Sequence, residues 1–122
     1  MGCVFCTLDK EKILFENDLA VAFFDNFPVS LGHTLIIPKR HSETYFDLTK
    51  EEITAIFELS KKVKELLCNK YHPDGYNIGF NVQEAGGQSV MHAHMHVIPR
   101  YKGDSDNPRG GIRKIVKIND RY

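Results

Sequence analysis

The sequence Gly86-Gly-Gln-Ser-Val-Met-His-Ala-His-Met-His-Val-Ile-Pro99 carries three of the six histidines of the chain, at the alternate positions 92, 94 and 96. Side chains in a β-strand alternate between the two faces of a sheet, so a strand over His92–Ile98 directs these three imidazoles to one face. Ala93, Met95 and Val97 then point to the opposite face, into a core. Residues two apart in a strand are about 6.6–6.8 Å apart, so the three rings can address one ligand.

Three imidazoles on one face fit two kinds of chemistry. Neutral histidines can hold a catalytic zinc that keeps an open position. Alternatively, one imidazole attacks phosphorus while the others donate hydrogen bonds. The preceding loop favours phosphate, because Gly86 and Gly87 allow backbone N–H groups to approach an anion closely. A zinc hydrolase also needs a carboxylate base; Glu84 is the nearest acidic residue, and the sequence has no His-Glu-x-x-His motif.

The rest of the chain predicts an α+β protein. Thr49 and Glu52 have the spacing of a capping box, and an apolar stripe follows them, which predicts a helix from Thr49 to about Tyr71. A short helical turn is expected near Ser42–Phe46. Further strands are predicted at Leu19–Phe24, at Thr34–Ile37, which Pro38 closes, and at Tyr76–Val82.

Composition restricts the class of protein. The 122 residues are 42% hydrophobic and 26% charged, which is typical of a folded domain, and we expect one domain over residues 1–122. Sixteen basic residues balance sixteen acidic ones, so bulk charge gives no reason to expect a nucleic-acid or membrane partner. The sequence has no apolar run of the roughly 18 residues needed to span a bilayer, no secretory signal and only three cysteines, so we expect a cytoplasmic protein.

The segment after Pro99 is locally basic. This segment is expected either to border a phosphate site or to form a solvated arm. Its charge is compatible with both. Its basic residues are Arg100, Lys102, Arg109, Arg113, Lys114 and Lys117, against only Asp104 and Asp106.

Together these sequences resemble the histidine triad (HIT) family of nucleotide hydrolases and transferases. The stretch His92–Ile98 matches the family signature, in which histidines alternate with apolar residues. Other landmarks follow in family order, namely Phe24-Asp25, Gly32-His-Thr-Leu-Ile-Ile-Pro-Lys-Arg-His41, Asn81 and Gly87–Val90. The segment after Pro99 is similar to bacterial members described as dinucleoside polyphosphate hydrolases. The resemblance implies a mostly antiparallel five-stranded sheet with one long and one short helix, paired as a two-fold homodimer.

The resemblance also implies an enzyme that acts at the α-phosphorus of a purine nucleotide, either a diadenosine polyphosphate or an adenosine 5′-phosphoramidate. His94, the middle histidine, is the expected nucleophile and forms a nucleotidyl-imidazole intermediate that water cleaves. His96 and His33 are expected to donate to the non-bridging phosphate oxygens, and Ser89 to lie near the leaving atom. The rival interpretations are a zinc hydrolase that uses the triad as ligands, and a nucleotide-binding module with little turnover.

Substrate-binding roles follow from the same resemblance. Asp25 is expected to accept hydrogen bonds from the ribose hydroxyls, Asn81 to hold the sugar or phosphate, and Gln88 to position the phosphate. An apolar slot for the base is expected from Val4, Phe5, Leu8, Phe23 and Leu35, residues that by composition alone are ordinary core.

Cys3 and Cys6 have the spacing of half a metal site, or of a redox motif, which should follow a strand and open a helix. Some members of the family hold a structural zinc with two such cysteines, the histidine after Pro-Lys-x and the first triad histidine. The matching residues here are Cys3, Cys6, His41 and His92, a closed Cys₂His₂ set. We therefore expect one structural zinc and no organic cofactor.

Overall fold

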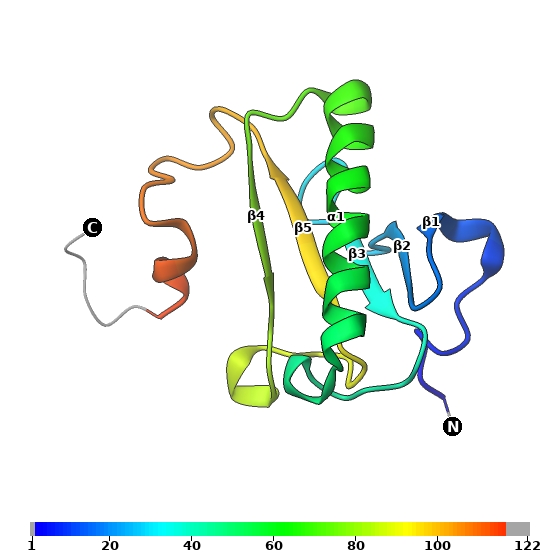
Figure 1. The fold of residues 1–122 in the computed structure, drawn as a ribbon. Helices are drawn as coiled ribbons and strands as arrows, with labels where there is room; N and C mark the ends of the chain where they lie inside the picture. Colours follow the sequence, from blue (N-terminus) through cyan, green and yellow to red (C-terminus); the bar gives the residue numbers. More distant parts are fainter. Residues whose placement is uncertain (1, 117–122) are drawn as a thin grey trace.

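The computed structural model describes residues 2–116, in which one antiparallel sheet carries one long helix on one face (Figure 1). Its strands lie in the order β1-β2-β3-β5-β4. They are β1 (Ile13–Glu16), β2 (Ala20–Phe24), β3 (Thr34–Pro38), β4 (Gly75–Phe80) and β5 (Met95–Arg100), with the helix α1 (Lys50–Tyr71) between β3 and β4 in sequence. Short 3₁₀ turns are η1 (Lys10–Lys12), η2 (Tyr45–Asp47), η3 (Glu84–Gly86) and η4 (Gly111–Ile115). This confirms the predicted sheet and long helix.

The helix begins where the sequence predicted. The Thr49 hydroxyl accepts from the backbone N–H of Glu52, and the Glu52 carboxylate accepts from the N–H of Thr49, which satisfies two N–H groups at the helix start. The predicted short helix is the 3₁₀ turn Tyr45–Asp47, which has a capping box of its own at Thr44.

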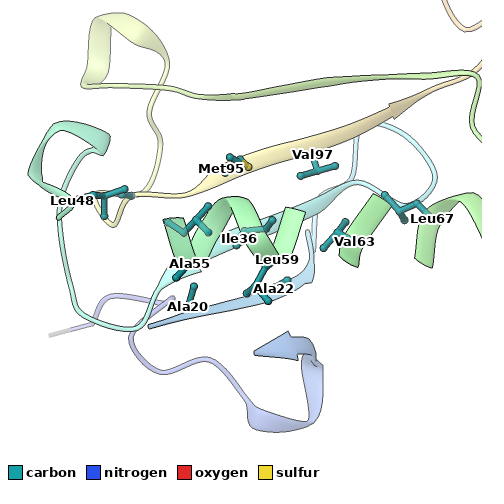
Figure 2. Packing of buried hydrophobic residues seen from close by; sticks show 12 residues of the cluster. Ala20, Ala22, Ile36, Leu48, Ala55, Leu59, Val63, Leu67, Met95 and Val97 are labelled. Atoms are coloured by element: carbon teal, nitrogen blue, oxygen red, sulfur yellow. The ribbon is translucent and has the colours of Figure 1, made fainter. Parts of the chain in front are cut away.

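The core lies between α1 and the sheet, as Figure 2 shows. From the helix, Ile56, Leu59, Val63 and Leu67 are at most 1% exposed. They pack against apolar side chains of the central strands, Ala20, Ala22, Ile36, Met95 and Val97. Each large side chain buried in this way contributes about 1.5–3 kcal/mol, so this face anchors the strand that carries the histidines.

The histidine segment differs from its prediction at both ends. Strand β5 begins at Met95, because β3 pairs with β5 only from Met95 to Val97, and the N–H of Ala93 bonds to the carbonyl of Ser42 instead. Alternation of side chains still extends to Ala93, which is 1% exposed in the core. At the other end β5 continues through Pro99 to Arg100.

Pro99 fits inside β5 because it lies past the end of β3. The nitrogen and carbonyl of one residue in an antiparallel strand face the same neighbour, and the Pro99 carbonyl accepts from the Ser30 hydroxyl at 2.8 Å. The missing N–H therefore removes no bond of the β3–β5 ladder, whose last pair is Thr34 and Val97. Strand β1 was not predicted, and β4 is Gly75–Phe80 where Tyr76–Val82 was expected.

The opposite face of the sheet is covered at its two sides by the ends of the chain. The N-terminal segment lies beside β1 and β2, and the segment after β5 runs outside β4 (Figure 1). From the N-terminal segment, Phe5 and Leu8 pack against a second buried cluster of Val21, Phe23, Leu35 and Ile37. The triad histidines lie on this face, between the two covering segments. No helix within residues 2–116 is long and apolar enough to cross a membrane.

Candidate active site and metal centre

Two cysteines and two histidines converge where the N-terminal segment meets the sheet. Nδ1 of His92 lies 3.4 Å from Sγ of Cys3 and 3.5 Å from Sγ of Cys6, and Nδ1 of His41 lies 3.2 Å from Sγ of Cys6. All four ligand atoms are within 4.8 Å of one another. A tetrahedral zinc separates its sulfur and nitrogen ligands by roughly 3.6 Å, so the set fits zinc closely.

The protonation of His92 also suits a metal. Its Nε2 lies 2.9 Å from the carbonyl oxygen of Pro38, which can only accept, so Nε2 carries the ring proton. The lone pair is then on Nδ1, the atom that faces both sulfurs. In zinc sites, the ring nitrogen of a histidine that does not bind the metal commonly donates its N–H to a backbone carbonyl, which fixes the tautomer in this way.

His94 has the opposite tautomer. Its Nδ1 lies 2.9 Å from the carbonyl oxygen of His92, so Nδ1 carries the proton and Nε2 keeps the lone pair. The side chain is buried, at 5% exposure, and its ring makes T-shaped contacts with the rings of Phe5 and His96. A neutral imidazole with one free lone pair is the form that acts as a nucleophile.

His33 and His96 are joined in a chain of hydrogen bonds. The backbone N–H of Val29 donates to Nδ1 of His33 at 3.1 Å, so the ring proton of neutral His33 is on Nε2. Nε2 lies 3.0 Å from Nδ1 of His96, which accepts, and His96 is left with an N–H at Nε2. Both nitrogens of His33 thus have protein partners, so the ring has no free N–H for a phosphate oxygen, in contrast to the role expected from the resemblance.

Burial keeps these two rings neutral. It lowers the pKa of His96 to about 4, and the neighbouring rings of His94 and His33 act in the same direction. Burial also lowers the pKa of His33, although the carboxylate of Asp25 opposes this effect. At neutral pH His96 is therefore neutral and offers the N–H at its Nε2.

Asp25, His33 and His96 form a second cluster with the spacing of a metal site. Its hydrogen bonds argue against a metal there, because the Nε2 atom of His33 that faces the cluster carries a proton. Oδ2 of Asp25 lies 3.5 Å from that nitrogen, and Oδ1 accepts from the backbone N–H of Phe27.

The glycine-rich loop is held by Gln88, whose amide is fully used by the protein. Its oxygen accepts from the N–H of Gln83, and its nitrogen donates to the carbonyls of Glu43 and Val90. Gln88 is 4% exposed, and its amide holds the loop that carries Ser89. Its expected role, to position the phosphate, stays a prediction. Gln83 in this loop adopts φ 65° and ψ 171°, a conformation that favours glycine and that sequence reasoning missed.

The other predicted contact residues lie on both sides of the histidines. Ser89 and Asn81 are exposed, and Asn81 donates to the carbonyl of Gly87 at 3.5 Å. On the side of the N-terminal segment, the structure brings together four residues of the expected base slot, Phe5, Leu8, Phe23 and Leu35. Val4, the fifth, is 61% exposed.

A pocket of about 420 Å³ lies on the other side, between β4, β5 and the segment after β5. His33 and His96 line its inner end, and Arg100 and Lys114 are cationic residues of its wall. Asp and Glu are absent from the described residues that line it, but Arg100 is paired with both carboxylate oxygens of Asp104, so Lys114 is the lining cation that has no carboxylate partner within residues 2–116. Lys117, the last residue of the basic segment, lies outside the described part of the chain.

Comparison with known proteins assigns the family. The model of the HIT domain matches residues 8–103. The chain belongs to the HIT family. Among curated HIT relatives, a HIT-like protein of Methanocaldococcus jannaschii is 36% identical, with 97% of this chain and 94% of the relative covered.

Two HIT relatives have names that state an activity. The adenosine 5′-monophosphoramidase of Schizosaccharomyces pombe is 38% identical, and the alignment covers 82% of this chain and 75% of the relative. The bis(5′-adenosyl)-triphosphatase of Dictyostelium discoideum is 34% identical, with 80% and 66% covered.

Solved HIT structures share the fold. A HIT family protein from Bacillus anthracis has a TM-score of 0.76 at 38% identity, covering 84% of this chain and 75% of its own. A zinc-bound histidine triad protein from Mycobacterium smegmatis has a TM-score of 0.77 at 31% identity, covering 85% and 78%.

Proposed function

We propose that this HIT protein hydrolyses a purine nucleotide at its α-phosphorus, through a covalent nucleotidyl intermediate on Nε2 of His94. The observation that carries the proposal is the hydrogen bond from Nδ1 of His94 to the carbonyl of His92. It leaves the lone pair of this buried ring on Nε2, and the ring of His96 lies next to it, with the ring centroids 4.9 Å apart. The names of the relatives from S. pombe and D. discoideum support an adenosine nucleotide as the substrate.

The proposed reaction has two displacements. In the first, the Nε2 lone pair of His94 forms a bond to the α-phosphorus, and the bond from phosphorus to the leaving group breaks. The exposed Ser89 hydroxyl is placed on the loop beside the triad to bond the leaving atom. In the second, the oxygen of a water molecule bonds to phosphorus and releases a proton to solvent, the electron pair of the phosphorus–nitrogen bond returns to Nε2 of His94, and the nucleoside monophosphate leaves. The N–H at Nε2 of His96 stabilises the charge on the phosphate oxygens in both steps.

Binding of the nucleotide is assigned to residues on either side of His94. Oδ2 of Asp25 accepts from the ribose hydroxyls, because Oδ1 is already bonded to the N–H of Phe27. Asn81 contacts the sugar or phosphate, and Gln88 acts through the position of its loop. The base lies against the apolar cluster of the N-terminal segment, from Val4, Phe5, Leu8, Phe23 and Leu35.

Two observations bear on the leaving group of the substrate. A pocket of about 420 Å³ beside His96 is large enough for a nucleoside and supports a dinucleoside polyphosphate. The phosphoramidase name of one relative supports adenosine 5′-phosphoramidate as the alternative. A nucleotide-binding module with little turnover is the third candidate.

Zinc in this proposal is structural. Cys3, Cys6, His41 and His92 hold it, and a closed set of four protein ligands leaves no position for substrate. Bound zinc ties the N-terminal segment to the sheet. The proposal also includes the two-fold homodimer, the cytoplasmic location, the single domain over residues 1–122 and the absence of a nucleic-acid partner that the sequence led us to expect.

One experiment tests the function. The protein is mixed with α-labelled diadenosine triphosphate or adenosine 5′-phosphoramidate and quenched in alkali within a single turnover. Label is expected on a peptide within residues 86–100, in a bond that is stable to alkali and labile to acid. Turnover that stops when a chelator removes metal from folded protein, without labelled peptide, would support a zinc hydrolase. No turnover of either substrate would support a binding module.

A further inference from the structure

The single N–H of the His33 ring faces two acceptors. From Nε2, the distance is 3.0 Å to Nδ1 of His96 and 3.5 Å to Oδ2 of Asp25. The backbone N–H of Val29 occupies Nδ1, so a neutral His33 has one proton to share between them. His33 is 3% exposed, which leaves little access for water to supply another partner.

The choice of acceptor matters for His96. When His33 donates to Nδ1 of His96, three donors run in one direction, from Val29 through His33 to the N–H at Nε2 of His96. Hydrogen bonds in such a chain polarise one another, so the last N–H becomes a better donor to a phosphate oxygen. When the proton is drawn towards Asp25, Nδ1 of His96 loses its partner, and the tautomer of His96 is no longer fixed.

The two contacts differ in kind. Nδ1 of His96, at 3.0 Å, accepts a hydrogen bond from His33, whereas Oδ2 of Asp25, at 3.5 Å, is within ion-pair distance and attracts the same proton through its negative charge. Oδ1 of Asp25 is held by the N–H of Phe27, so Oδ2 is the oxygen that both His33 and an incoming hydroxyl would meet. A ligand at Oδ2 therefore competes directly with the longer of the two contacts.

We propose that a ribose bound at Asp25 commits the His33 proton to His96, and that the ribose hydroxyls thereby accelerate the chemical step. The proposal rests on the assignment of Asp25 to the ribose in the proposed function. Hydroxyls that donate to Oδ2 reduce its attraction for the His33 N–H, and the proton then goes to Nδ1 of His96. His33 is a positioning residue in this arrangement, and it links the sugar site to the phosphate site without touching the substrate.

The test compares substrates with and without the hydroxyls. The 5′-phosphoramidates of adenosine and 2′,3′-dideoxyadenosine are measured at saturation, with the matching diadenosine triphosphates in parallel. A contact that only binds ribose changes KM, whereas the proposed link also changes kcat. We expect kcat to be roughly three- to tenfold higher with the ribose, the effect of one hydrogen bond. Equal kcat values for the two sugars would overturn the proposal.

Variants locate the link. Asp25→Asn removes the charge that competes for the proton, while the amide oxygen can still accept from Phe27. The ratio of kcat with the adenosine substrate to kcat with the dideoxyadenosine substrate should therefore fall to about one. In His33→Gln the ratio should also fall to about one, although Asp25 remains to bind the sugar. Asp18→Asn, an exposed control, should keep the ratio of the wild type. A ratio that persists in His33→Gln would show that the hydroxyls act by another route.

A second measurement needs no turnover. Nitrogen NMR of ¹⁵N-labelled protein reads the tautomers of His33 and His96 directly, first alone and then with adenosine monophosphate or its 2′,3′-dideoxy analogue. Only the ribose form should shift Nδ1 of His96, and the same shift with both ligands would contradict the proposal. If neither substrate is hydrolysed, the proposed function fails, whereas this measurement still tests the link between the sugar and His96.

Discussion

Arg40 binds both carboxylate oxygens of Glu52, from Nε at 2.9 Å and from Nη2 at 2.7 Å, and so fastens the segment after β3 to the first turn of α1. Glu52 is 3% exposed, and Arg40 holds the pKa of its carboxyl below the ordinary value. Pro38, whose carbonyl orients His92, ends β3 directly before the fastened segment, and His41, a proposed zinc ligand, lies within that segment. A surface arginine and a helix-capping glutamate thus hold the segment that carries one ligand of the proposed metal centre.

Replacing Arg40 should therefore affect both stability and zinc. Arg40→Met leaves a buried carboxylate without its cation and should lower the free energy of unfolding by about 1–3 kcal/mol. Zinc affinity, measured by competition with a coloured chelator, should fall roughly tenfold. The control is Lys39→Met, which removes the exposed ion pair with Glu16 and should cost less than about 1 kcal/mol. Equal effects of the two variants would contradict this role for Arg40.

The strained backbone at Gln83 predicts a stabilising substitution. A φ of 65° with ψ 171° costs a residue with a side chain roughly 1–3 kcal/mol, whereas glycine adopts it freely. Against this, glycine has more conformational freedom in the unfolded chain, which lowers the free energy of unfolding by about 0.5–1 kcal/mol. Gln83→Gly should therefore raise the free energy of urea unfolding by roughly 1 kcal/mol. Gln83→Ala keeps the strain and should give no gain, so a gain from both variants would point to a cause in the side chain.

The half-buried His96 predicts how stability depends on pH. Folded His96 takes up a proton only near pH 4, whereas an unfolded histidine does so near pH 6.5. Between these values the unfolded chain binds more protons, so the stability contributed by neutral His96 is present above pH 6.5 and is lost as the pH falls towards 4. Urea unfolding at pH 7 and pH 5 should show a smaller loss in His96→Gln than in the wild type. An equal loss in both would assign it to other groups, including the zinc ligands.

Zinc binding predicts a selective effect of the two N-terminal cysteines. Purified protein should contain about one zinc per chain, and zinc at 100 times its dissociation constant stabilises a protein by about 2.7 kcal/mol. Cys3→Ser with Cys6→Ser should lose both the metal and this stability. Cys68→Ser, which changes a cysteine of α1 that bonds the Tyr76 hydroxyl, should keep the metal. Metal-free protein with an unchanged melting temperature would refute the site.

The sequence predicted those features that repeat along the chain, and it missed those that depend on single backbone groups. Alternation at Ala93, Met95 and Val97 indicated the face of the histidines, and it held even though the strand itself starts only at Met95. The donor that sets the tautomer of His33 is the backbone N–H of Val29. Every residue except proline has such an N–H, so the residue type does not reveal this role. The four-residue strand β1 is too short for a period to emerge.

The site shows the same division. Family landmarks indicated which residues would gather, but the hydrogen bonds of each ring decide what it can offer. Both nitrogens of His33 and the whole amide of Gln88 are used within the protein, and neither fact follows from a motif. Tautomers depend on tertiary partners, which one sequence does not specify.

The nucleophile can be separated from the groups that support it by comparing turnover with binding. His94→Asn should abolish turnover while nucleotide affinity stays within a few-fold, because base, ribose and phosphate oxygens hold the ground state. Removal of Nε2 deletes the covalent path, and only steps on that path should suffer. By contrast, His96→Ala and Ser89→Ala each remove one donor and should leave a residual rate, lower by roughly 10²–10³-fold.

The matched control for this comparison is His72→Asn, at the left-handed residue that ends α1, where asparagine is well tolerated. It changes one histidine to asparagine far along the chain from the triad and should leave kcat and affinity unchanged. Single-turnover rates and equilibrium binding of adenosine monophosphate are measured for all four variants. If His94→Asn still turns over at a rate like that of His96→Ala, His94 is a supporting donor. Water would then attack phosphorus directly, and the three histidines would act together on the phosphate charge.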